Sequence, residues 1–345
     1  MKLQKHPIIR ENLLQIIDFL KKDEKTCITL MSRFIKQGDI ELLPNHIKGY
    51  SFYLDKEVVG VLAISDGGIV LHHFRNDILV EEKPIFAELK EIVLQILLSH
   101  NIYSIIGDMK GTDFLRKSLE NERQPKIIIP YTLMLFNERQ NKKQPLLPEN
   151  FSLKKCTSQD TEALYPLQAA YDIVEVLPPG EVFNPDNCRL NLHHNLANQY
   201  ILGLFSDTEK VFVAKAGTNA IGLNWVQLGG VFTKEDFRGR GFASFLVKPP
   251  LGCGIKQRQH FRLVDLVIKH SARQPDNIAF ACPQRSRRPR RLIIQLLQSL
   301  FDPLPGGIRH PGGTAAVEVV GYQSSRNARM KCYIFQCCPH KTPLA

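Results

Sequence analysis

The sequence predicts an α/β protein of the α+β type, with mixed, mostly antiparallel sheets that are flanked by helices. Short β-branched runs separated by polar turns predict antiparallel strands. Longer segments with apolar residues at helical spacing predict the flanking helices. The same order of elements returns after a polar, proline-containing stretch, so we expect two units that share one architectural plan.

The first unit begins with two predicted helices at residues 12–22 and 24–37, the second ended by Gly38. The remaining expected elements are strands at 50–54, 58–64 and 69–74, a helix at 84–97, a strand at 102–106, a helix at 113–119 and a strand at 127–136. His72 and His73 lie on one of these strands, where we expect a structural role rather than catalysis.

The second unit begins after a predicted linker at residues 137–150. Its expected elements are a helix at 158–170, strands at 200–205, 211–216 and 221–233, and a turn at 217–219 between the last two strands. The predicted domains are therefore a degenerate N-terminal domain at 1–148, a core domain at 149–247 and an atypical basic segment at 248–345.

The net charge of +11 is confined to the last segment of the chain. Residues 248–345 contain 16 Lys and Arg against 4 Asp and Glu, whereas residues 1–247 contain 29 against 30. Arginine and cysteine use also changes after Val247, which leads to the hypothesis of a shifted reading frame or a gene fusion. The competing interpretation is a polybasic contact with nucleic acid or an anionic membrane through residues 285–291. Without interleaved aromatic residues or a recognised motif, nucleic acid is the less favoured partner.

Other functional classes are disfavoured by composition. The chain has no apolar run approaching the roughly 20 residues of a membrane span, so nothing is expected to cross a bilayer, and a membrane is not among the favoured partners. The polar start is not a signal peptide, and the cytoplasm is the expected location. Eight scattered cysteines without a C-x-x-C pair predict neither a metal site nor a disulfide framework.

One segment has the composition of an anion-binding loop. Residues 229–243 join the end of a predicted strand to an apolar helix, and they carry glycines at both ends of the connection. A glycine-rich turn of this kind exposes unpaired backbone N–H groups at the positive end of the helix dipole. It therefore predicts a site for a phosphate or diphosphate group.

This segment resembles the GNAT superfamily of acetyltransferases. The resemblance is continuous from Gly229 to Ala243, where Val231-Phe232-Thr233 and then Arg238-Gly-Arg-Gly-Phe-Ala243 follow the pattern of the superfamily. The proline that is often found soon after the threonine is absent, and Lys234 and Glu235 stand there instead. The resemblance covers residues 151–247 well, whereas residues 1–148 resemble only the fold. It implies a tandem GNAT-like acyl-CoA N-acyltransferase fold.

The resemblance also implies an activity and a set of site residues. The chain would transfer an acetyl group from acetyl-CoA to a primary amine by direct attack in a ternary complex. The unidentified acceptor would be a small molecule or a peptide, and no metal is required. The coenzyme A diphosphate would bind the backbone amides of Arg238, Gly239, Arg240, Gly241, Phe242 and Ala243, and the pantetheine arm would lie beside Val231, Phe232 and Thr233. Glu175 is the candidate base, and Asn224 and Gln227 are candidates for orienting the acceptor.

Several alternatives stay open at this stage. Gly239 and Gly241 would also suit a plain surface turn. Arg238 would suit a solvated loop charge, and Phe232 and Phe242 would suit ordinary core packing. Glu175 would suit an ordinary surface carboxylate or a charge at a helix end.

At the level of function, the main alternative is a catalytically inactive acyl-CoA-binding or interaction protein. Pro249 and Pro250 would cut the helix after the loop, and no tyrosine can be assigned as the acid. Residues 263–268 are the candidate for a fifth strand. A nucleic-acid-binding protein that acts through its tail is a second alternative.

Overall fold

The computed structural model describes residues 2–36, 38–128, 131–135, 147, 149–177, 181–247, 262–269, 318–323 and 329–334. Most of the predicted linker, the Pro249-Pro250 pair and the basic run at 285–291 lie outside these residues. The chain divides into two compact units, Met1–Leu133 with Phe301–Ala345, and Met134–Leu300. Among the helices that the structure describes, none has the length and apolar character needed to cross a membrane.

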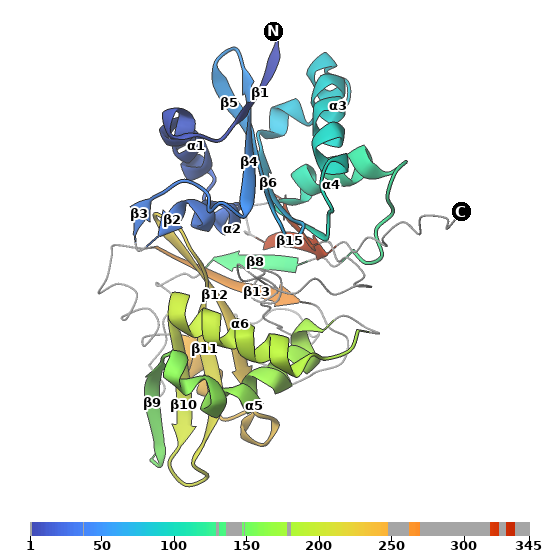
Figure 1. The fold of residues 1–345 in the computed structure, drawn as a ribbon. Helices are drawn as coiled ribbons and strands as arrows, with labels where there is room; N and C mark the ends of the chain where they lie inside the picture. The colour runs from blue at the N-terminus through green and yellow to red at the C-terminus, as the bar shows by residue number, and fades with distance from the viewer. Residues whose placement is uncertain are drawn as a thin grey trace, which may run out of the picture. The chain divides into compact units, whose positions relative to one another are not determined.

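Unit 1 is built on a five-stranded sheet in the order β1-β4-β5-β6-β7, in which only the β6–β7 pair is parallel. Helix α1 lies on one side of this sheet and α3 on the other (Figure 1). The described elements of the unit are β1 (Leu3–Pro7), α1 (Arg10–Lys22), α2 (Ile28–Met31), η1 (Ser32–Phe34), β2 (Ile35–Lys36), β3 (Asp39–Ile40), β4 (Ile47–Leu54), β5 (Glu57–Ser65), β6 (Ile69–Phe74), η2 (Asn76–Ile78), α3 (Pro84–Leu98), β7 (Ser104–Ile106), α4 (Met109–Leu119), β14 (Glu318–Gln323) and β15 (Arg329–Ile334).

The core of unit 1 lies between the sheet and helices α3 and α4. Phe52 and Phe74 of the strands belong to the same buried apolar cluster as Leu89 of α3 and Phe114 of α4. Pro84 occupies the first turn of α3, as its fixed φ angle and missing N–H predict. The predicted meander and the helix that follows it are thus confirmed.

The predicted helix at 24–37 is wrong in its extent. The chain forms only one short α-helix, Ile28–Met31, followed by the 3-10 turn Ser32–Phe34, and then pairs Ile35 with Ile40 in a small hairpin. Gly38 has a φ of 98°, which suits the tight turn of this hairpin rather than the end of a long helix. Local pairing therefore replaced the helix that the apolar pattern predicted.

Unit 2 is built on a six-stranded sheet in the order β8-β13-β12-β11-β10-β9. Its pairs β9–β10, β10–β11 and β11–β12 are antiparallel, and β12–β13 is parallel. The described elements are β8 (Tyr131–Leu135), β9 (Phe151–Cys156), η4 (Ser158–Asp160), α5 (Thr161–Tyr171), η5 (Asp172–Val176), α6 (Pro185–Asn198), β10 (Ile201–Ser206), β11 (Val211–Ile221), β12 (Trp225–Thr233), η6 (Glu235–Phe237), α7 (Phe242–Val247) and β13 (Arg262–Lys269). The predicted α/β class with mixed sheets and flanking helices is confirmed.

Unit 2 differs from the sequence prediction in several details. Strand β9 was missed, and the strand predicted at 127–136 in the first unit belongs to this sheet as β8. The predicted turn at 217–219 lies inside β11, because Thr218 exchanges hydrogen bonds with Tyr200 and pairs with Leu228. The true turn lies at residues 222–224, where the N–H of Gly222 donates to the carbonyl of Trp225. Helix α6 was missed, although Asn184 caps it and Pro185 occupies its first turn.

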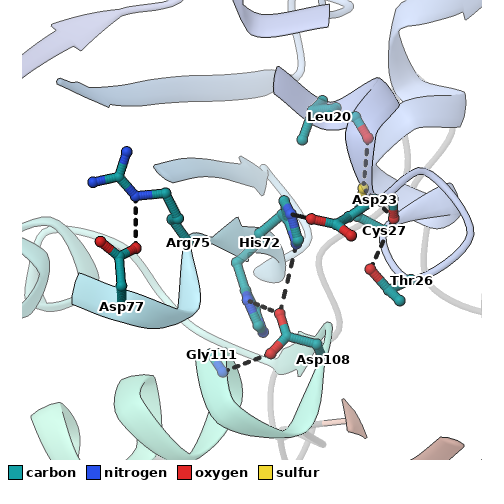
Figure 2. A network of polar contacts seen from close by, with 10 residues as sticks. Leu20, Asp23, Thr26, Cys27, His72, Arg75, Asp77, Asp108 and Gly111 are labelled. Carbon is teal, nitrogen blue, oxygen red and sulfur yellow. Dashed lines mark hydrogen bonds and ion pairs between the residues drawn. The ribbon is translucent and has the colours of Figure 1, made fainter. Parts of the chain in front are cut away.

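In unit 1, a buried polar network lies where the parallel strands β6 and β7 end their pairing. The pairing stops at Leu71–Ile106, and the ring of the next residue, His72, occupies the adjoining space. A Cβ on Gly107 would lie 2.1 Å from this ring. His72 Nε2 lies 2.6 Å from Thr112 Oγ1. Figure 2 shows Asp108 between His72 and Gly111, whose N–H donates to its carboxylate.

His73 points to the opposite face from His72, as neighbouring residues of a strand do. Its ring contacts Phe19 of α1. Its Nε2 lies 3.6 Å from Asp23 Oδ2, and its Nδ1 lies 3.7 Å from Asp108 Oδ2. Both distances exceed those of hydrogen bonds, so these contacts are ion pairs. The structural role expected for the two histidines agrees with their burial.

The two histidines have opposite protonation behaviour. Burial lowers the pKa of His72 to about 4, against the attraction of Asp108. Burial acts in the same direction on His73, but the carboxylates of Asp108 and Asp23 outweigh it and raise its pKa to about 9. His73 is therefore a buried cation at neutral pH, and His72 is neutral beside it.

The raised pKa of His73 predicts a pH-dependent stability. Because its pKa is about 9 in the folded chain and about 6.5 in the unfolded chain, its ion pairs contribute fully below pH 6.5 and are lost as the pH rises through 9. Replacing His73 by Gln should flatten the fall in the free energy of unfolding across this window by up to about 1.4 kcal/mol per pH unit. Denaturant unfolding at several pH values measures this. His6→Gln, at an exposed position, is the control, and equal slopes in both variants would contradict the prediction.

Candidate functional site

In unit 2 the parallel strands β12 and β13 pair over a short distance and then part. The pairing runs from Trp225–Arg262 to Gln227–Val264, whereas β12 continues to Thr233 and β13 to Lys269. The predicted fifth strand at 263–268 is thus confirmed as β13. Gln227, at the last paired position, is buried, and its Oε1 has no hydrogen-bond partner among the described residues. A buried oxygen left in this state costs free energy, so this position is a candidate ligand contact.

Strand β12 carries a bulge beyond this point. Lys215 pairs with Phe232 and Gly217 with Gly229, so that Gly230 and Val231 together stand opposite Ala216 alone. Gly230 has a φ of 58°, the left-handed conformation that a glycine adopts without strain in such a bulge. A bulge leaves one residue outside the regular ladder, and bulges of this kind are frequent next to active sites.

The glycine loop follows β12 after the 3-10 turn Glu235–Phe237. Gly239 and Gly241 have φ angles of 75° and 79°. Apart from their chain neighbours, the described residues place no heavy atom within 4 Å of a Cβ built on either glycine. The backbone conformation therefore favours glycine at both positions, and no described residue fills the space beside them. Arg238 Nε donates to the carbonyl of Thr233 at 3.2 Å, and Arg240 Nη2 donates to the carbonyl of Asp236 at 3.1 Å. Both arginine side chains are therefore bound to carbonyl groups that precede the loop, and the two arginines flank Gly239 in the chain.

The predicted lining residues divide between the two faces of the sheet. Val231, Phe242 and Ala243 belong to the apolar core around α7, where the ring of Phe242 lies 4.8 Å from that of Phe151. Phe232 lies on the other face, with its ring 5.7 Å from that of Tyr171 and 5.5 Å from the guanidinium of Arg238. Core packing thus accounts for Phe242, whereas Phe232 connects the loop to the α5 side of the sheet.

The predicted acceptor-side residues come from two separate segments. Glu175 lies on the π-turn Asp172–Val176 that follows α5, and it is only 4% exposed. The alternative of an ordinary surface carboxylate is therefore wrong. Asn224 lies in the turn between β11 and β12 rather than on a strand. A π-turn is an uncommon element that occurs frequently at functional sites.

A buried polar layer between the sheet and α5 was missed by the sequence analysis. Lys215 of β11 is 3% exposed, and its Nζ donates to the carbonyl of Gly230 at 3.1 Å. The same Nζ lies 4.4 Å from the centre of the Tyr171 ring. Asp172 is also buried and accepts a hydrogen bond from Gln168 Nε2 at 2.7 Å. The only signal in the sequence was a charged residue in the middle of an otherwise apolar strand.

The charges of this layer are held in an apolar setting. Burial lowers the pKa of Lys215 to about 8, and the negative charge of Asp172 opposes this shift. Burial raises the pKa of Asp172, whereas the Cys188 thiol and Lys215 lower it. Burial also raises the pKa of Cys156 to about 12, so this thiol is not a nucleophile at neutral pH. The layer therefore contains a perturbed cation beside a perturbed carboxyl group, as functional sites often do.

The described residues of unit 1 form no equivalent site at the corresponding place. Its parallel pair β6–β7 also runs over three residue positions, from Ile69–Ser104 to Leu71–Ile106. Strand β6 ends at Phe74 and leads into the 3-10 turn Asn76–Ile78 without a glycine. The ring of His72 fills the space where the strands part. Among the residues that the structure describes in either unit, no group of three or more His, Cys, Asp and Glu could hold a metal ion.

Known structures resemble this chain at low sequence identity. A Drosophila protein determined by structural genomics has a TM-score of 0.53 at 12% identity, with 78% of this chain and 90% of that chain covered. A tandem GNAT protein from the clavulanic acid biosynthesis pathway has a TM-score of 0.46 at 11% identity, with 76% and 89% covered. A GCN5-related N-acetyltransferase from Sphaerobacter thermophilus has a TM-score of 0.45 at 12% identity, with 79% and 88% covered.

Sequence comparison adds no closer relative. No protein-family model matches the chain, and no curated protein sequence matches it either. At sequence identities of 11–12%, a structural likeness shows the fold and not the activity. The known structures that this chain resembles include GNAT acetyltransferases, one of them a tandem protein, and the likeness concerns the fold alone.

Proposed function

We propose that unit 2 is an N-acetyltransferase that moves the acetyl group of acetyl-CoA to a primary amine of a small molecule or peptide. The observation that carries this proposal is the sequence of three features along one strand. β12 parts from its parallel neighbour after Gln227, bulges at Gly230 and then enters the glycine loop 238–243. Along the chain, this arrangement provides first a gap between two strands, then a displaced backbone segment at the bulge, and finally a loop suited to an anion.

The loop fits the diphosphate of coenzyme A. Both glycines adopt conformations that L-residues rarely take, and a Cβ on either of them would meet no atom of the described residues beyond its chain neighbours. The backbone N–H groups of Arg238 to Ala243 would therefore be accessible to phosphate oxygens. The guanidinium groups of Arg238 and Arg240 add positive charge on either side of Gly239. We assign the pantetheine arm to the strand residues Val231, Phe232 and Thr233.

The transfer requires an amine that is held close to the acetyl group and a base that accepts the proton the amine loses. Acetyl-CoA would supply an activated acyl group, whose C–S bond breaks as the new C–N bond forms. The proton lost by the acceptor nitrogen replaces the acetyl group on the coenzyme A sulfur. We assign Glu175 as the base that carries this proton and Asn224 as a residue that orients the acceptor. The burial of Glu175 supports the first assignment, because a base in a dry site acts on a bound amine rather than on water.

The remaining assignments follow from this proposal. The functional domains would be 1–148, 149–247 and 248–345, and the protein would act in the cytoplasm without a metal, a membrane or a nucleic acid. An acyl-CoA-binding protein without turnover would use the same loop. Binding of acetyl-CoA with no transfer to any amine would establish that alternative.

Acetyl-CoA binding tests the loop assignment. We expect calorimetry on the full chain to detect binding that the double variant Gly239→Glu/Gly241→Glu weakens by more than about 100-fold, because two carboxylates would face the phosphates. The double variant Gly239→Gln/Gly241→Gln has the same size and backbone strain without the charge, and we expect it to lose less affinity. Equal losses in both variants would mean that space or strain, and not charge, governs the site. A well-folded parent chain that does not bind acetyl-CoA would refute the proposed function.

The role of Glu175 is tested separately. With a panel of primary amines as acceptors, Glu175→Gln should lower kcat by about 100-fold and leave the Kd of acetyl-CoA nearly unchanged. Raising the pH should recover part of the loss, since more of the free amine is then unprotonated. The control is Glu162→Gln, on the exposed side of α5. Gln168 is not chosen for this purpose, because it contacts Asp172. An unchanged kcat in Glu175→Gln would remove this residue from the mechanism.

A further inference from the structure

The bulge of β12 is held by a side chain from the neighbouring strand. Lys215 precedes Ala216, the single β11 residue that stands opposite Gly230 and Val231. Its Nζ reaches across the strand pair and donates to the carbonyl of Gly230 at 3.1 Å. A hydrogen bond from an ammonium group is stronger than one between neutral groups. This contact therefore fixes the direction of the peptide group that Gly230 shares with Val231.

The position of Lys215 is itself constrained from the other side. Its Nζ lies 4.4 Å from the centre of the fully buried Tyr171 ring, and this ring stands edge-on to Phe232 at 5.7 Å. Cation–π contacts of this kind gain strength when both partners are removed from water. The ammonium group is thus held between an aromatic face and a backbone carbonyl. Movement of Lys215 would disturb both β12 and α5.

Burial of this lysine is unfavourable unless specific contacts compensate for the lost hydration of its ammonium group. The titratable groups around it are Asp172 on η5, Cys188 on α6 and Cys156 on β9. Asp172 accepts a hydrogen bond from Gln168 Nε2, and its negative charge acts on Lys215 without a close ion pair between the two described residues. A methionine would fill the same space without this cost, which points to a role of the charge at the bulge.

We propose that Lys215 is a positioning residue for acetyl transfer, whose ammonium group fixes the Gly230–Val231 bulge and thereby the backbone donor that polarises the thioester carbonyl. This inference rests on the proposed function of unit 2. Lys215 acts through the backbone of β12 and does not itself contact the acceptor. Polarisation of a carbonyl by a preorganised backbone donor depends strongly on its placement, since a displacement of 1 Å can cost about 100-fold in rate.

The test measures the carbonyl itself and needs no acceptor. Acetyl-CoA labelled with ¹³C at the thioester carbonyl is bound to the full chain, and its ¹³C chemical shift is compared with that of free acetyl-CoA. We expect a downfield shift in the parent chain, because a polarised carbonyl carbon is more electron-poor. In Lys215→Met the shift should return toward the free value, while the Kd of acetyl-CoA changes by less than about threefold. The exposed Lys155→Met on β9 is the matched control and should behave as the parent does.

The shift measurement separates the failure of this inference from the failure of the proposed function. If the parent binds acetyl-CoA and Lys215→Met has the parent's carbonyl shift, Lys215 has no positioning role. A bound carbonyl in the parent with the shift of free acetyl-CoA overturns the inference equally, although the cofactor assignment stands. A parent that does not bind acetyl-CoA refutes the proposed function and the inference together. Where Lys215→Met does not fold, Lys215→Gln provides the same comparison with a smaller change in polarity.

A double-mutant cycle then tests the route through the backbone. Gly230→Ala strains the same bulge, because a φ of 58° is unfavourable for alanine. If Lys215 acts through Gly230, the double variant Lys215→Met/Gly230→Ala should lose no more of the ¹³C shift than the more severe single variant. Additive losses would show that Lys215 acts independently of the bulge and would overturn the inference.

Discussion

In each unit, two parallel strands stay paired for three residue positions and then part, and the space beyond the last pair has to be filled. Unit 1 fills it from within: the ring of His72 packs against Gly107 and Gly111, and Asp108 holds the first turn of α4 beside it. Unit 2 leaves the buried oxygen of Gln227 without a hydrogen bond from the described residues at the corresponding place and continues into a bulge and a glycine loop. The same constraint on the backbone thus yields a closed core in one unit and a candidate site in the other.

Among the described residues, each unit also buries a cation at this end of its sheet, and the two cations differ in their surroundings. His73 lies between two carboxylates, which raise its pKa to about 9 and make it a stabilising charge at neutral pH. Lys215 has weaker compensation, and burial lowers its pKa to about 8. Paired charge of the first kind contributes to stability, whereas an incompletely paired charge is a cost that a functional role explains. The contrast supports a structural role for the first site and a functional role for the second.

Parts of the candidate site were visible in the sequence because they depend on local backbone chemistry. The glycines of the loop have positive φ angles, a conformation that favours glycine over other residues. The bulge at Gly230 and the buried layer around Lys215 and Asp172 were not visible. Both depend on which residues of β11 and β12 stand opposite one another, and a register between strands leaves little trace in either strand alone. The roles proposed for Glu175 and Asn224 remain predictions.

The sequence by itself determined the class of the fold, the meander of unit 1, the first turn of α3 at Pro84 and the glycine loop at 238–243. These features follow from alternation, helical spacing and the conformational limits of proline and glycine, all of which act over a few neighbouring residues. Only the tertiary structure decided that residues 32–40 form a turn and a hairpin, that Thr218 continues β11, and that Lys215 reaches the carbonyl of Gly230. Each of these outcomes depends on a partner distant in the sequence or on competition between local pairings, and a local pattern contains no information about such a partner.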